Sequence, residues 1–289
     1  MVVKILKSMS MIYNEDCNLG FDNLSQSYGK FVDVVITSPP YAEQRKNQYT
    51  SINEKDYPMW TLQWVNSCEK ILKDEGSIFI NIRPHIKNGV ISDYVLKTRL
   101  LLRENGWKEC EELIWIKPDS PPLGSICRPR RSWEHILWFS KTSKPYVDVK
   151  KGGSISSRIG FENSKFEHGG SSHIHAGQNN SKVGKARIKD YIECGTGRVE
   201  KGLGHPAMFP RELPSYLINM ACPTNGIVLD PFMGSGTTMR ECVNKDVGFL
   251  GFEIDGEYFN IASKSLYDEI ISNGKDKQYA EYIERSSAY

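Results

Sequence analysis

Long hydrophobic runs are missing from this 289-residue sequence. Runs such as Val34–Ile36 and Leu100–Leu102 are far shorter than the roughly 20 apolar residues of a membrane-spanning helix. Near the start, two lysines interrupt the segment MVVKILKSMSM, which is not the pattern of a signal peptide. We therefore expect no membrane contact and a cytoplasmic location.

Cysteines at the spacings of disulfide frameworks or zinc sites are also lacking. The seven cysteines are scattered, no two are spaced C-x-x-C, and none forms a compact cluster with histidines. This pattern argues against a disulfide scaffold and a structural zinc site. We expect reduced thiols and no bound metal ion.

The whole chain carries little excess of either charge, because 37 Lys and Arg face 35 Asp and Glu, a net charge of +2. The distribution is uneven, however. Residues 141–205 hold 12 Lys and Arg against 6 Asp and Glu, a balance of +6, and 11 of the 24 glycines. A basic insert on a slightly acidic body indicates a polyanionic partner.

Short apolar runs rich in β-branched residues alternate with helical periodicity through most of the chain. This alternation predicts an α/β fold with a mostly parallel sheet covered on both faces. Expected strands are 10–13, 32–37, 76–82, 109–116, 133–139, 226–229 and 247–252. Expected helices are 59–73, 92–105, 211–221, 236–244 and 256–271. Residues 141–205 show neither period, so they form either a disordered linker or a loop-rich module built for contact.

The first motif, Thr37-Ser38-Pro39-Pro40-Tyr41, directly follows the apolar strand VDVVI. The end of such a strand faces the ligand crevice of an open α/β sheet. Two prolines fix φ and remove two donors, so the Ser38 and Pro39 carbonyls become rigid acceptors. With the Ser38 hydroxyl and the Tyr41 ring, they suit a planar base bearing an amino group. Alone, the motif equally fits a turn with a packed tyrosine.

The second motif, GIVLDPFMGSGTT at 226–238, predicts a strand, an acidic residue, a Gly-rich turn and the start of a helix. The turn has no lysine and is not a P-loop. Gly234 and Gly236 would let the backbone approach a ligand. Glu253 ends the next strand, where an acidic residue commonly holds ribose hydroxyls. Together these features fit an adenosine ligand without a pyrophosphate, such as S-adenosylmethionine.

With both motifs in this order, the chain resembles the permuted amino-methyltransferases of DNA, in which the catalytic motif precedes the cofactor motif. The segments NEDC, VDVVITSPPY, ILKDEGSIFINI, WEHILWFSK, HPAMFPRELPSYLI and VLDPFMGSGTT through GFLGFEIDGEY follow that family's order across nearly the whole chain. TSPPYAEQRKNQY is most similar to the cytosine-N4 enzymes of restriction–modification systems. The resemblance implies a circularly permuted class I methyltransferase fold with a Rossmann-like, mostly parallel seven-stranded sheet. It implies a catalytic half at 1–140, an inserted target-recognition module at 141–205 and a cofactor-binding half at 206–289.

The resemblance also implies roles for individual residues. The catalytic, target-base pocket would comprise Ser38, Pro39, Pro40 and Tyr41. The cofactor would be S-adenosylmethionine, and the product formed from it S-adenosylhomocysteine. The residues that would bind the cofactor are Asp16, Thr37, Pro206, Phe209, Pro210, Asp230, Phe232, Gly234, Ser235, Gly236, Thr237, Thr238 and Glu253. One position departs from the family, because some relatives carry an acidic residue where this chain has Asn81. Asparagine cannot take a proton at neutral pH, so a carboxylate base at that position is not expected.

Basic and aromatic residues supply the expected DNA surface. The candidates for phosphate contact are Arg128, Arg130, Arg131, Lys150, Lys151, Arg158, Lys182, Lys185 and Arg187. The run Arg128–Arg131 equally fits a solvated charged surface. Trp133 and Trp138 lie in an expected strand, and we expect both in the core.

The predicted reaction is methyl transfer to the exocyclic N4 amine of a flipped cytosine in double-stranded DNA. Serine in the first motif position favours cytosine N4, since relatives with aspartate there mostly modify adenine. Adenine-N6 transfer is the alternative, and a non-catalytic DNA-binding protein on a relic methyltransferase fold is a more distant one. A cognate restriction endonuclease, acting separately, is an expected partner.

Overall fold

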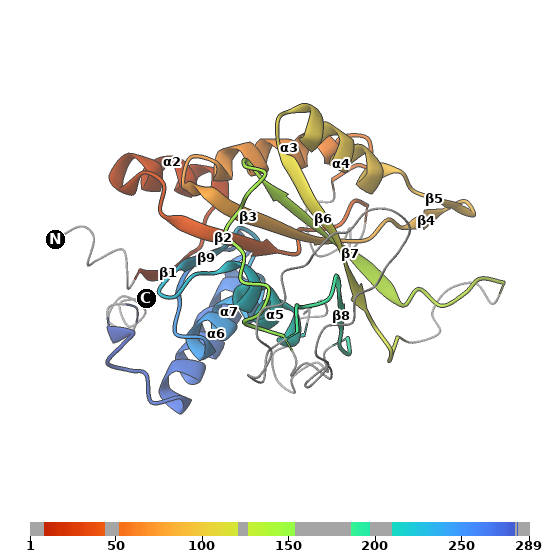
Figure 1. The fold of residues 1–289 in the computed structure, drawn as a ribbon. Coiled ribbons are helices and arrows are strands. Elements are labelled where there is room, and N and C mark those ends of the chain that lie inside the picture. The colour runs from red at the N-terminus through yellow and green to blue at the C-terminus, as the bar shows by residue number, and fades with distance from the viewer. Residues whose placement is uncertain are drawn as a thin grey trace, which may run out of the picture.

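An eight-stranded sheet forms the centre of the molecule, in a computed structural model that describes residues 9–43, 52–120, 127–153, 186–196, 210–280 and 282 (Figure 1). The strands, counted within those residues, are β1 (Ser10–Tyr13), β2 (Val32–Thr37), β3 (Leu72–Ile82), β6 (Lys108–Ile116), β7 (Trp133–Ser140), β8 (Tyr191–Glu193), β9 (Ile227–Asp230) and β10 (Gly248–Phe252). Their order across the sheet is β1-β10-β9-β2-β3-β7-β6-β8. β7 is antiparallel to both its neighbours, and every other pairing is parallel. The α/β fold is confirmed.

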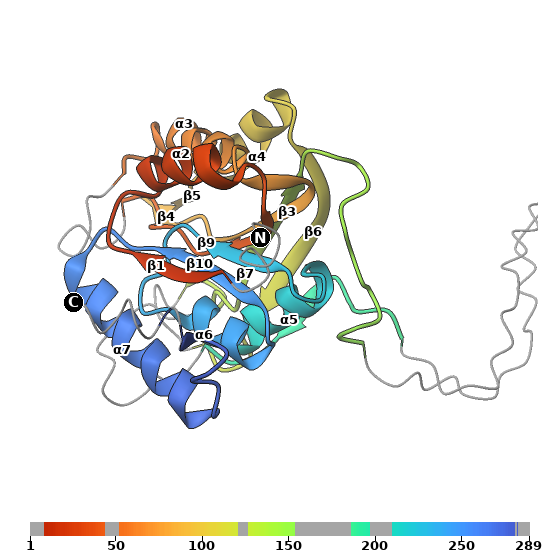
Figure 2. The ribbon, with the colours of Figure 1, turned by 90° about the vertical axis from the view of Figure 1, so that its left-hand side faces the viewer.

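Helices cover both faces of the sheet (Figures 1 and 2). α2 (Cys17–Tyr28), α3 (Tyr57–Cys68) and α4 (Tyr94–Glu104) lie on one face, and α5 (Glu212–Ala221), α6 (Thr237–Asn244) and α7 (Gly256–Ser272) lie on the other. The strands feed both layers because successive side chains alternate across the sheet. On β2, Val35 packs in the hydrophobic core beneath α2, α3 and α4. Val34 and Ile36 pack in the core on the opposite face, beneath α5, α6 and α7. A continuous apolar strand is therefore buried on both sides, as the sequence predicts.

The chain order of the strands differs from their order in space. β2 carries the TSPPY motif and precedes β9 by nearly 200 residues, yet the two strands pair at the middle of the sheet, with Val34 opposite Val228 and Val35 opposite Leu229. This arrangement is the circular permutation that the motif order predicts. It places the ends of β2 and β9 at the same edge of the sheet.

The expected strands are all present, but one boundary was wrong. β3 begins at Leu72 rather than at 76, and α3 correspondingly ends at Cys68 rather than near 73. The segment Lys73–Gly76 has the composition of a turn. Leu72 nevertheless pairs with Val32 of β2, and the pairing register of the two strands shifts between Val32 and Val34. The irregularity lets the strand continue through polar residues.

Four elements were not expected from the sequence. One is α2, whose ends are marked by the N-cap Asp16 and by Gly29 at φ +65°. β4 (Ile86–Lys87) and β5 (Val90–Ile91) form a small ribbon whose turn residues, Asn88 and Gly89, both have positive φ. The fourth is β8, which adds an eighth strand to the expected seven by pairing with β6.

β8 lies inside the predicted target-recognition module at 141–205, so part of that segment belongs to the central sheet. One nearby module residue also bonds to the core, because the Asp148 N–H donates to the Met220 carbonyl at 2.7 Å, and within the module the Ile188 N–H donates to the Val149 carbonyl at 2.8 Å. The division into a catalytic half, a module and a cofactor-binding half stays a prediction. The contacts show where a module would be attached.

Candidate active site

The two sequence motifs meet at the ends of neighbouring strands. β2 ends in Thr37 and β9 ends in Asp230. Thr37 Oγ1 donates to Asp230 Oδ1 at 2.7 Å, a buried hydrogen bond between residues 193 positions apart in the sequence. The permuted sheet thus joins the TSPPY motif and the Gly-rich turn into one site at its carboxyl edge, where ligands of open α/β sheets bind.

Asp230 is a fully buried carboxylate with three donors. Besides Thr37, Thr238 Oγ1 donates to its Oδ2 at 2.8 Å and the Phe232 N–H to its Oδ1 at 3.1 Å. Burial raises the pKa of Asp230 to about 6, although these hydrogen bonds favour the ionised form. The carboxylate therefore links β2, β9 and the first turn of α6.

The Gly-rich turn approaches the end of β10. Gly234 has φ +52°, and its N–H donates to Glu253 Oε2 at 3.0 Å, while the Asp255 N–H donates to Oε1 at 2.9 Å. Burial raises the pKa of Glu253. Each Glu253 oxygen has one of these backbone donors and a second lone pair. The carboxylate is therefore fixed in place and suited to accept from ligand hydroxyls.

Gly236 begins α6 where this helix lies close to α7. It is the N-cap of α6 with φ +81°, and a Cβ atom built on it would lie 3.3 Å from the Ala262 Cβ on α7. The absent side chain would therefore face α7, which gives glycine a packing role at this position. Glycine is required here because α6 and α7 lie close together. A cofactor contact through the Gly236 backbone stays a prediction.

The expected adenine contact, Asp16, caps a helix. Its Oδ1 accepts from the Asn18 N–H at 2.8 Å at the start of α2. Asn14 Nδ2 donates to the Glu253 carbonyl at 2.8 Å, which ties this N-terminal segment to the end of β10. Asp16 and Glu253 therefore lie on two segments joined by a hydrogen bond, and the adenine contact of Asp16 stays a prediction.

Several other predicted cofactor residues lie around this turn. Phe232 packs against Trp60 and Trp64, with ring centroids 5.3 and 5.4 Å away. Ser235 and Thr237 are buried, and the Ser235 carbonyl accepts from Ser265 Oγ at 3.2 Å. Pro210 is buried just before α5. Pro206 and Phe209 lie outside the described residues.

The TSPPY motif leads into a buried polar cluster. The Tyr41 hydroxyl donates to Glu134 Oε2 at 2.7 Å, and Asn81 Nδ2 donates to the Tyr41 oxygen at 3.0 Å and to Glu134 Oε2 at 2.9 Å. Burial and the Glu134 charge raise the pKa of Tyr41 well above its usual value, whereas the Ser38 side chain favours the ionised form of that hydroxyl and so acts to lower its pKa. The motif is therefore anchored to β3 and β7 through polar side chains, unlike a simple packed turn.

Sequence reasoning missed Glu134 and its partner Lys117. Lys117 Nζ pairs with Glu134 Oε1, and both residues are only 6% exposed. An unusual signal was present, since a glutamate at 134 stands inside an apolar strand, WEHILWFS. The lysine gave no such signal, because it follows β6 and reaches Glu134 only through the pairing of β6 with β7.

The three arginines of the CRPRRSW segment bond to backbone carbonyls. Arg128 donates to Gly89, Arg130 to Ser120 and Arg131 to Pro84. Arg128 and Arg130 are exposed and Arg131 is half-buried, so the segment is held in place and leaves charge at the surface. Lys150, Lys151 and Arg187 are also exposed. Arg158, Lys182 and Lys185 lie outside the described residues.

The tryptophans of β7 behave differently from each other. Trp138 packs on Phe79 with ring centroids 5.5 Å apart, as expected for the core. Trp133 is 46% exposed, so its expected place in the core was wrong. It opens β7, where the strand reaches the edge of the molecule and begins directly after the arginine segment.

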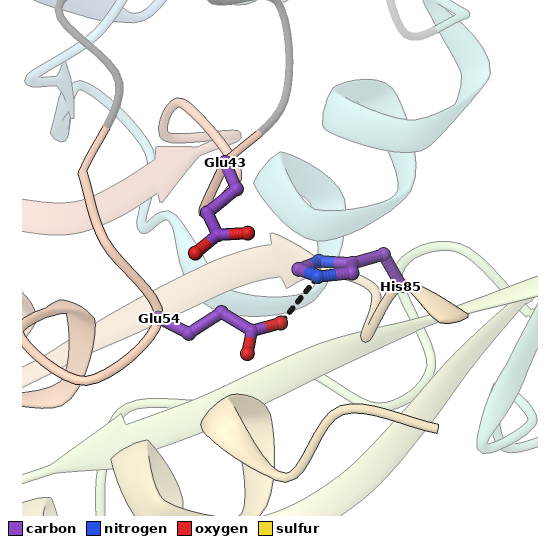
Figure 3. A group of neighbouring side chains, drawn as sticks. All are labelled: Glu43, Glu54 and His85. Atoms are coloured by element: carbon purple, nitrogen blue, oxygen red, sulfur yellow. Dashed lines mark ion pairs between the residues drawn. The ribbon is translucent and has the colours of Figure 1, made fainter. Parts of the chain in front are cut away.

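A group of ligand-type side chains lies beyond the TSPPY motif (Figure 3). Glu43, Glu54 and His85 bring one ligand atom each within 4.8 Å of one another. Glu54 pairs with His85, and Glu43 Oε2 accepts from Lys87 Nζ at 2.6 Å. Because both carboxylates have a basic partner, we interpret this group as paired charges. The absence of a metal site stays a prediction.

Two further expectations concern cysteines and membranes. All seven cysteines are free, and burial raises the pKa of Cys17 and Cys222 to about 12. Such thiols are poor nucleophiles at neutral pH. Among the described residues, no helix has the length and apolar character needed to cross a bilayer.

The fold and the site together define a methyltransferase of the Rossmann-like α/β type. A family model described as DNA methylase matches residues 32–264, and the chain belongs to this family of N6 and N4 methyltransferases. The chain is 26% identical over 273 residues to the Type II methyltransferase M.PvuII of Proteus hauseri, covering 84% of this chain and 80% of the relative. It is 28% identical over 267 residues to M.BglII of Bacillus subtilis, covering 90% and 70%.

Solved structures confirm the fold. The PvuII DNA methyltransferase, described as cytosine-N4-specific, superposes with a TM-score of 0.67 and 22% identity over 91% of both chains. M1.HpyAVI, solved as a complex with SAM, gives a TM-score of 0.61 and 24% identity, covering 89% of this chain and 99% of that one. The resemblance to DNA amino-methyltransferases is thus confirmed.

Proposed function

We propose that the protein transfers a methyl group from S-adenosylmethionine to the N4 amine of a cytosine flipped out of duplex DNA. The observation that carries the proposal is the Thr37–Asp230 hydrogen bond, which joins the end of the TSPPY strand to the end of the Gly-rich-turn strand. A cofactor at the turn and a base at the TSPPY motif would then lie side by side. Such positioning supplies much of the catalysis in a transfer between two bound groups.

The residues at the turn fit S-adenosylmethionine. Glu253 is held by two backbone donors with lone pairs to spare for ribose hydroxyls, and the positive φ of Gly234 brings backbone close to the same carboxylate. No lysine stands in the turn to hold a pyrophosphate. The remaining contacts we propose are Asp16, Thr37, Pro206, Phe209, Pro210, Asp230, Phe232, Ser235, Gly236, Thr237 and Thr238. When bound, S-adenosylmethionine supplies an electrophilic methyl group.

The TSPPY residues would activate the amine. The lone pair of an exocyclic amine is delocalised into the base, so the nitrogen is a poor nucleophile until it becomes pyramidal. Ser38 Oγ and the Pro39 carbonyl would accept its two hydrogens and favour that geometry, with Pro40 fixing the turn. The Tyr41 ring would stack on the extruded base and offset part of the cost of flipping, which is a few kcal/mol. No cysteine is needed.

Cytosine N4 is favoured over adenine N6 by the serine at the first motif position and by the similarity to the PvuII enzyme. The basic residues Arg128, Arg130, Arg131, Lys150, Lys151, Arg158, Lys182, Lys185 and Arg187 would contact phosphates, and residues 141–205 would read the sequence. The named relatives are Type II methyltransferases, so a separate endonuclease with the same recognition sequence is the proposed partner.

The test uses S-adenosylmethionine labelled in its methyl group and unmethylated genomic DNA. After reaction, the DNA is digested to nucleosides and the labelled product is identified by mass spectrometry. We expect N4-methylcytosine. Labelled N6-methyladenine would establish the adenine alternative, and DNA binding without any transfer would point to a relic fold.

A further inference from the structure

The polar cluster behind the TSPPY motif has one unsatisfied atom. Asn81 is 5% exposed, and its Nδ2 donates to both the Tyr41 oxygen and Glu134 Oε2. Its Oδ1 is buried and, in the part of the chain that the structure describes, has no hydrogen-bond partner. A buried acceptor left unpaired destabilises the folded protein, because it has lost its hydrogen bonds to water. An incoming N–H donor would recover this free energy.

Glu134 determines which way the Asn81 amide points. Burial disfavours its ionised form, but Lys117, Tyr41 and Arg83 outweigh burial and hold the pKa of Glu134 below its usual value. An ionised carboxylate only accepts hydrogen bonds. The opposite amide orientation would set Asn81 Oδ1 against Glu134 Oε2, lone pair against lone pair. The NH2 group therefore faces Glu134, and the oxygen is left free.

The register of the sheet brings this oxygen to the target-base motif. On β2, Thr37 lies opposite Ile80 of β3, so Ser38 and Asn81 are the next residues along two adjacent strands. Asn81 Nδ2 also donates to the Tyr41 hydroxyl at 3.0 Å, and Tyr41 belongs to the same motif as Ser38. One acceptor side chain, Ser38, directly follows β2, and the other, Asn81, is the next-to-last residue of β3, so both lie at the carboxyl edge where an amine would bind.

We propose that Asn81 Oδ1 shares one hydrogen of the target amine with Ser38 Oγ, and that Glu134 is the positioning residue that fixes the amide. The inference rests on the proposed function and deepens it. Positive charge develops on the amine nitrogen as the methyl group arrives, and an amide oxygen with no other donor stabilises that charge. The proton is released to water afterwards. Glu134 is a poor proton acceptor because Lys117 and Tyr41 already occupy its oxygens.

The test compares kcat for single variants and an exchanged pair. Asn81→Leu removes the acceptor at similar volume and should lower kcat by about 100-fold, by analogy with removal of one oxyanion-hole donor. Glu134→Gln allows the Asn81 amide to turn over, and Asn81→Asp places two carboxylates face to face. The exchanged pair, Asn81→Asp with Glu134→Gln, restores one acceptor facing one donor. It should be at least tenfold faster than either of its single variants.

A purely structural role would not produce this recovery. The matched control is Glu112→Gln on the neighbouring strand β6, where the carboxylate pairs with Arg99 outside the cluster. It should keep the wild-type rate. KM for DNA and cofactor should stay within about threefold in all variants, because the proposed bond strengthens only in the transition state. If Glu134→Gln fails to fold with Lys117 unpaired, adding Lys117→Met removes both buried charges.

Two results would overturn the inference: wild-type kcat in Asn81→Leu, or an exchanged pair no faster than its folded single variants. The wild-type protein is measured first with labelled S-adenosylmethionine and DNA. If it transfers no methyl group, the proposed function fails. If the wild-type protein is active and the variants have the same kcat as the wild type, the proposed function stands and only the role of Asn81 and Glu134 fails.

Discussion

At the scale of single residues, Asp230 is a buried carboxylate that links the TSPPY motif to the Gly-rich turn. Its carboxylate accepts hydrogen bonds from Thr37, Thr238 and the Phe232 N–H. These donors are neutral, so they compensate only part of the cost of burying a charge. The pKa is raised from 3.8 to about 6 as a result. Proton binding at this one side chain is therefore coupled to the stability of the whole site.

The first prediction concerns that coupling. Because the folded pKa lies above the unfolded one, Asp230 contributes fully to stability below pH 4 and loses this contribution as pH rises through about 6. The loss amounts to about 3 kcal/mol by pH 8, at roughly 1.4 kcal/mol per pKa unit. The Asp230→Asn variant has no titrating group at this position, so it should not show this loss of stability. Between pH 5 and pH 8, where about half of that loss falls, urea unfolding of the cofactor-free protein should show a decrease of about 1.4 kcal/mol that Asp230→Asn lacks. Parallel pH curves for the two proteins would contradict the prediction.

The second prediction concerns Ser38. Ser38→Ala keeps the Pro-Pro turn but removes an acceptor from the amine, so kcat should fall by roughly 100- to 1000-fold. Cofactor and DNA affinity should barely change, since the bond strengthens as the nitrogen becomes pyramidal. Single-turnover kinetics and titration calorimetry separate the two effects. A wild-type rate would reduce the TSPPY motif to a strand-ending turn.

At the scale of elements, α6 and α7 approach each other at Gly236. This glycine has φ +81°, and a Cβ would meet Ala262 at 3.3 Å. A left-handed conformation costs a residue with a side chain about 1–2 kcal/mol. Gly236→Val should therefore lower the thermal midpoint through both backbone strain and the contact with α7. Loss of cofactor binding would follow from the displaced helix.

Two further variants separate these causes. Gly106 has φ +86° with nothing within 4 Å of a built Cβ, so Gly106→Val measures strain without a contact. Ala262→Gly added to Gly236→Val should recover the part of the stability that the clash with α7 removes. If it recovers nothing, helix contact is not what requires glycine at 236.

The elements also show how far the sequence leads. Apolar runs predicted most of the seven main strands, because strands buried on both faces need continuous hydrophobic residues. β6 is partly polar and only its second half, Leu113–Ile116, is apolar. β8 escaped prediction because Tyr191–Glu193 is stabilised by pairing with β6, which no local pattern records. The ends of β2 at Thr37 and of β9 at Asp230 were predictable, because each follows an apolar run and precedes a Pro-rich or Gly-rich turn. The Lys117–Glu134 pair was not, because it depends on the register between β6 and β7.

At the scale of the whole molecule, Gly153 and Ala186, the described residues on either side of 154–185, lie next to each other. A Cβ built on Gly153 would fall 1.9 Å from the Ala186 carbonyl oxygen, so the two attachment points lie side by side. Removing all of 141–205 would also remove β8 and its neighbours from the core. A shorter excision, of 154–185 alone, leaves every described contact in place.

A prediction for the module follows from that geometry. A two-residue Asn-Gly turn replacing 154–185 should preserve cooperative unfolding and S-adenosylmethionine binding but abolish sequence-specific DNA binding. The slope of log affinity against log salt should become shallower by about 0.9 for each phosphate that the shortened protein no longer neutralises. Competition binding between specific and random duplexes measures both. If the shortened protein keeps its sequence specificity, recognition does not depend on residues 154–185, and Arg128, Arg130 and Arg131 become the candidates for it.

The pairing of β2 with β9 also constrains how the protein is made. A ribosome that has synthesised β1 to β7 has produced the TSPPY motif but neither β9 nor β10, which occupy the sheet between β1 and β2. Until they emerge, the apolar β2 has one open edge, and open strand edges promote aggregation. Closing contacts between residues 193 positions apart is also slow. We therefore expect chains terminated before residue 227 to depend on chaperones, and the sheet to close only after β9 and β10 have been synthesised.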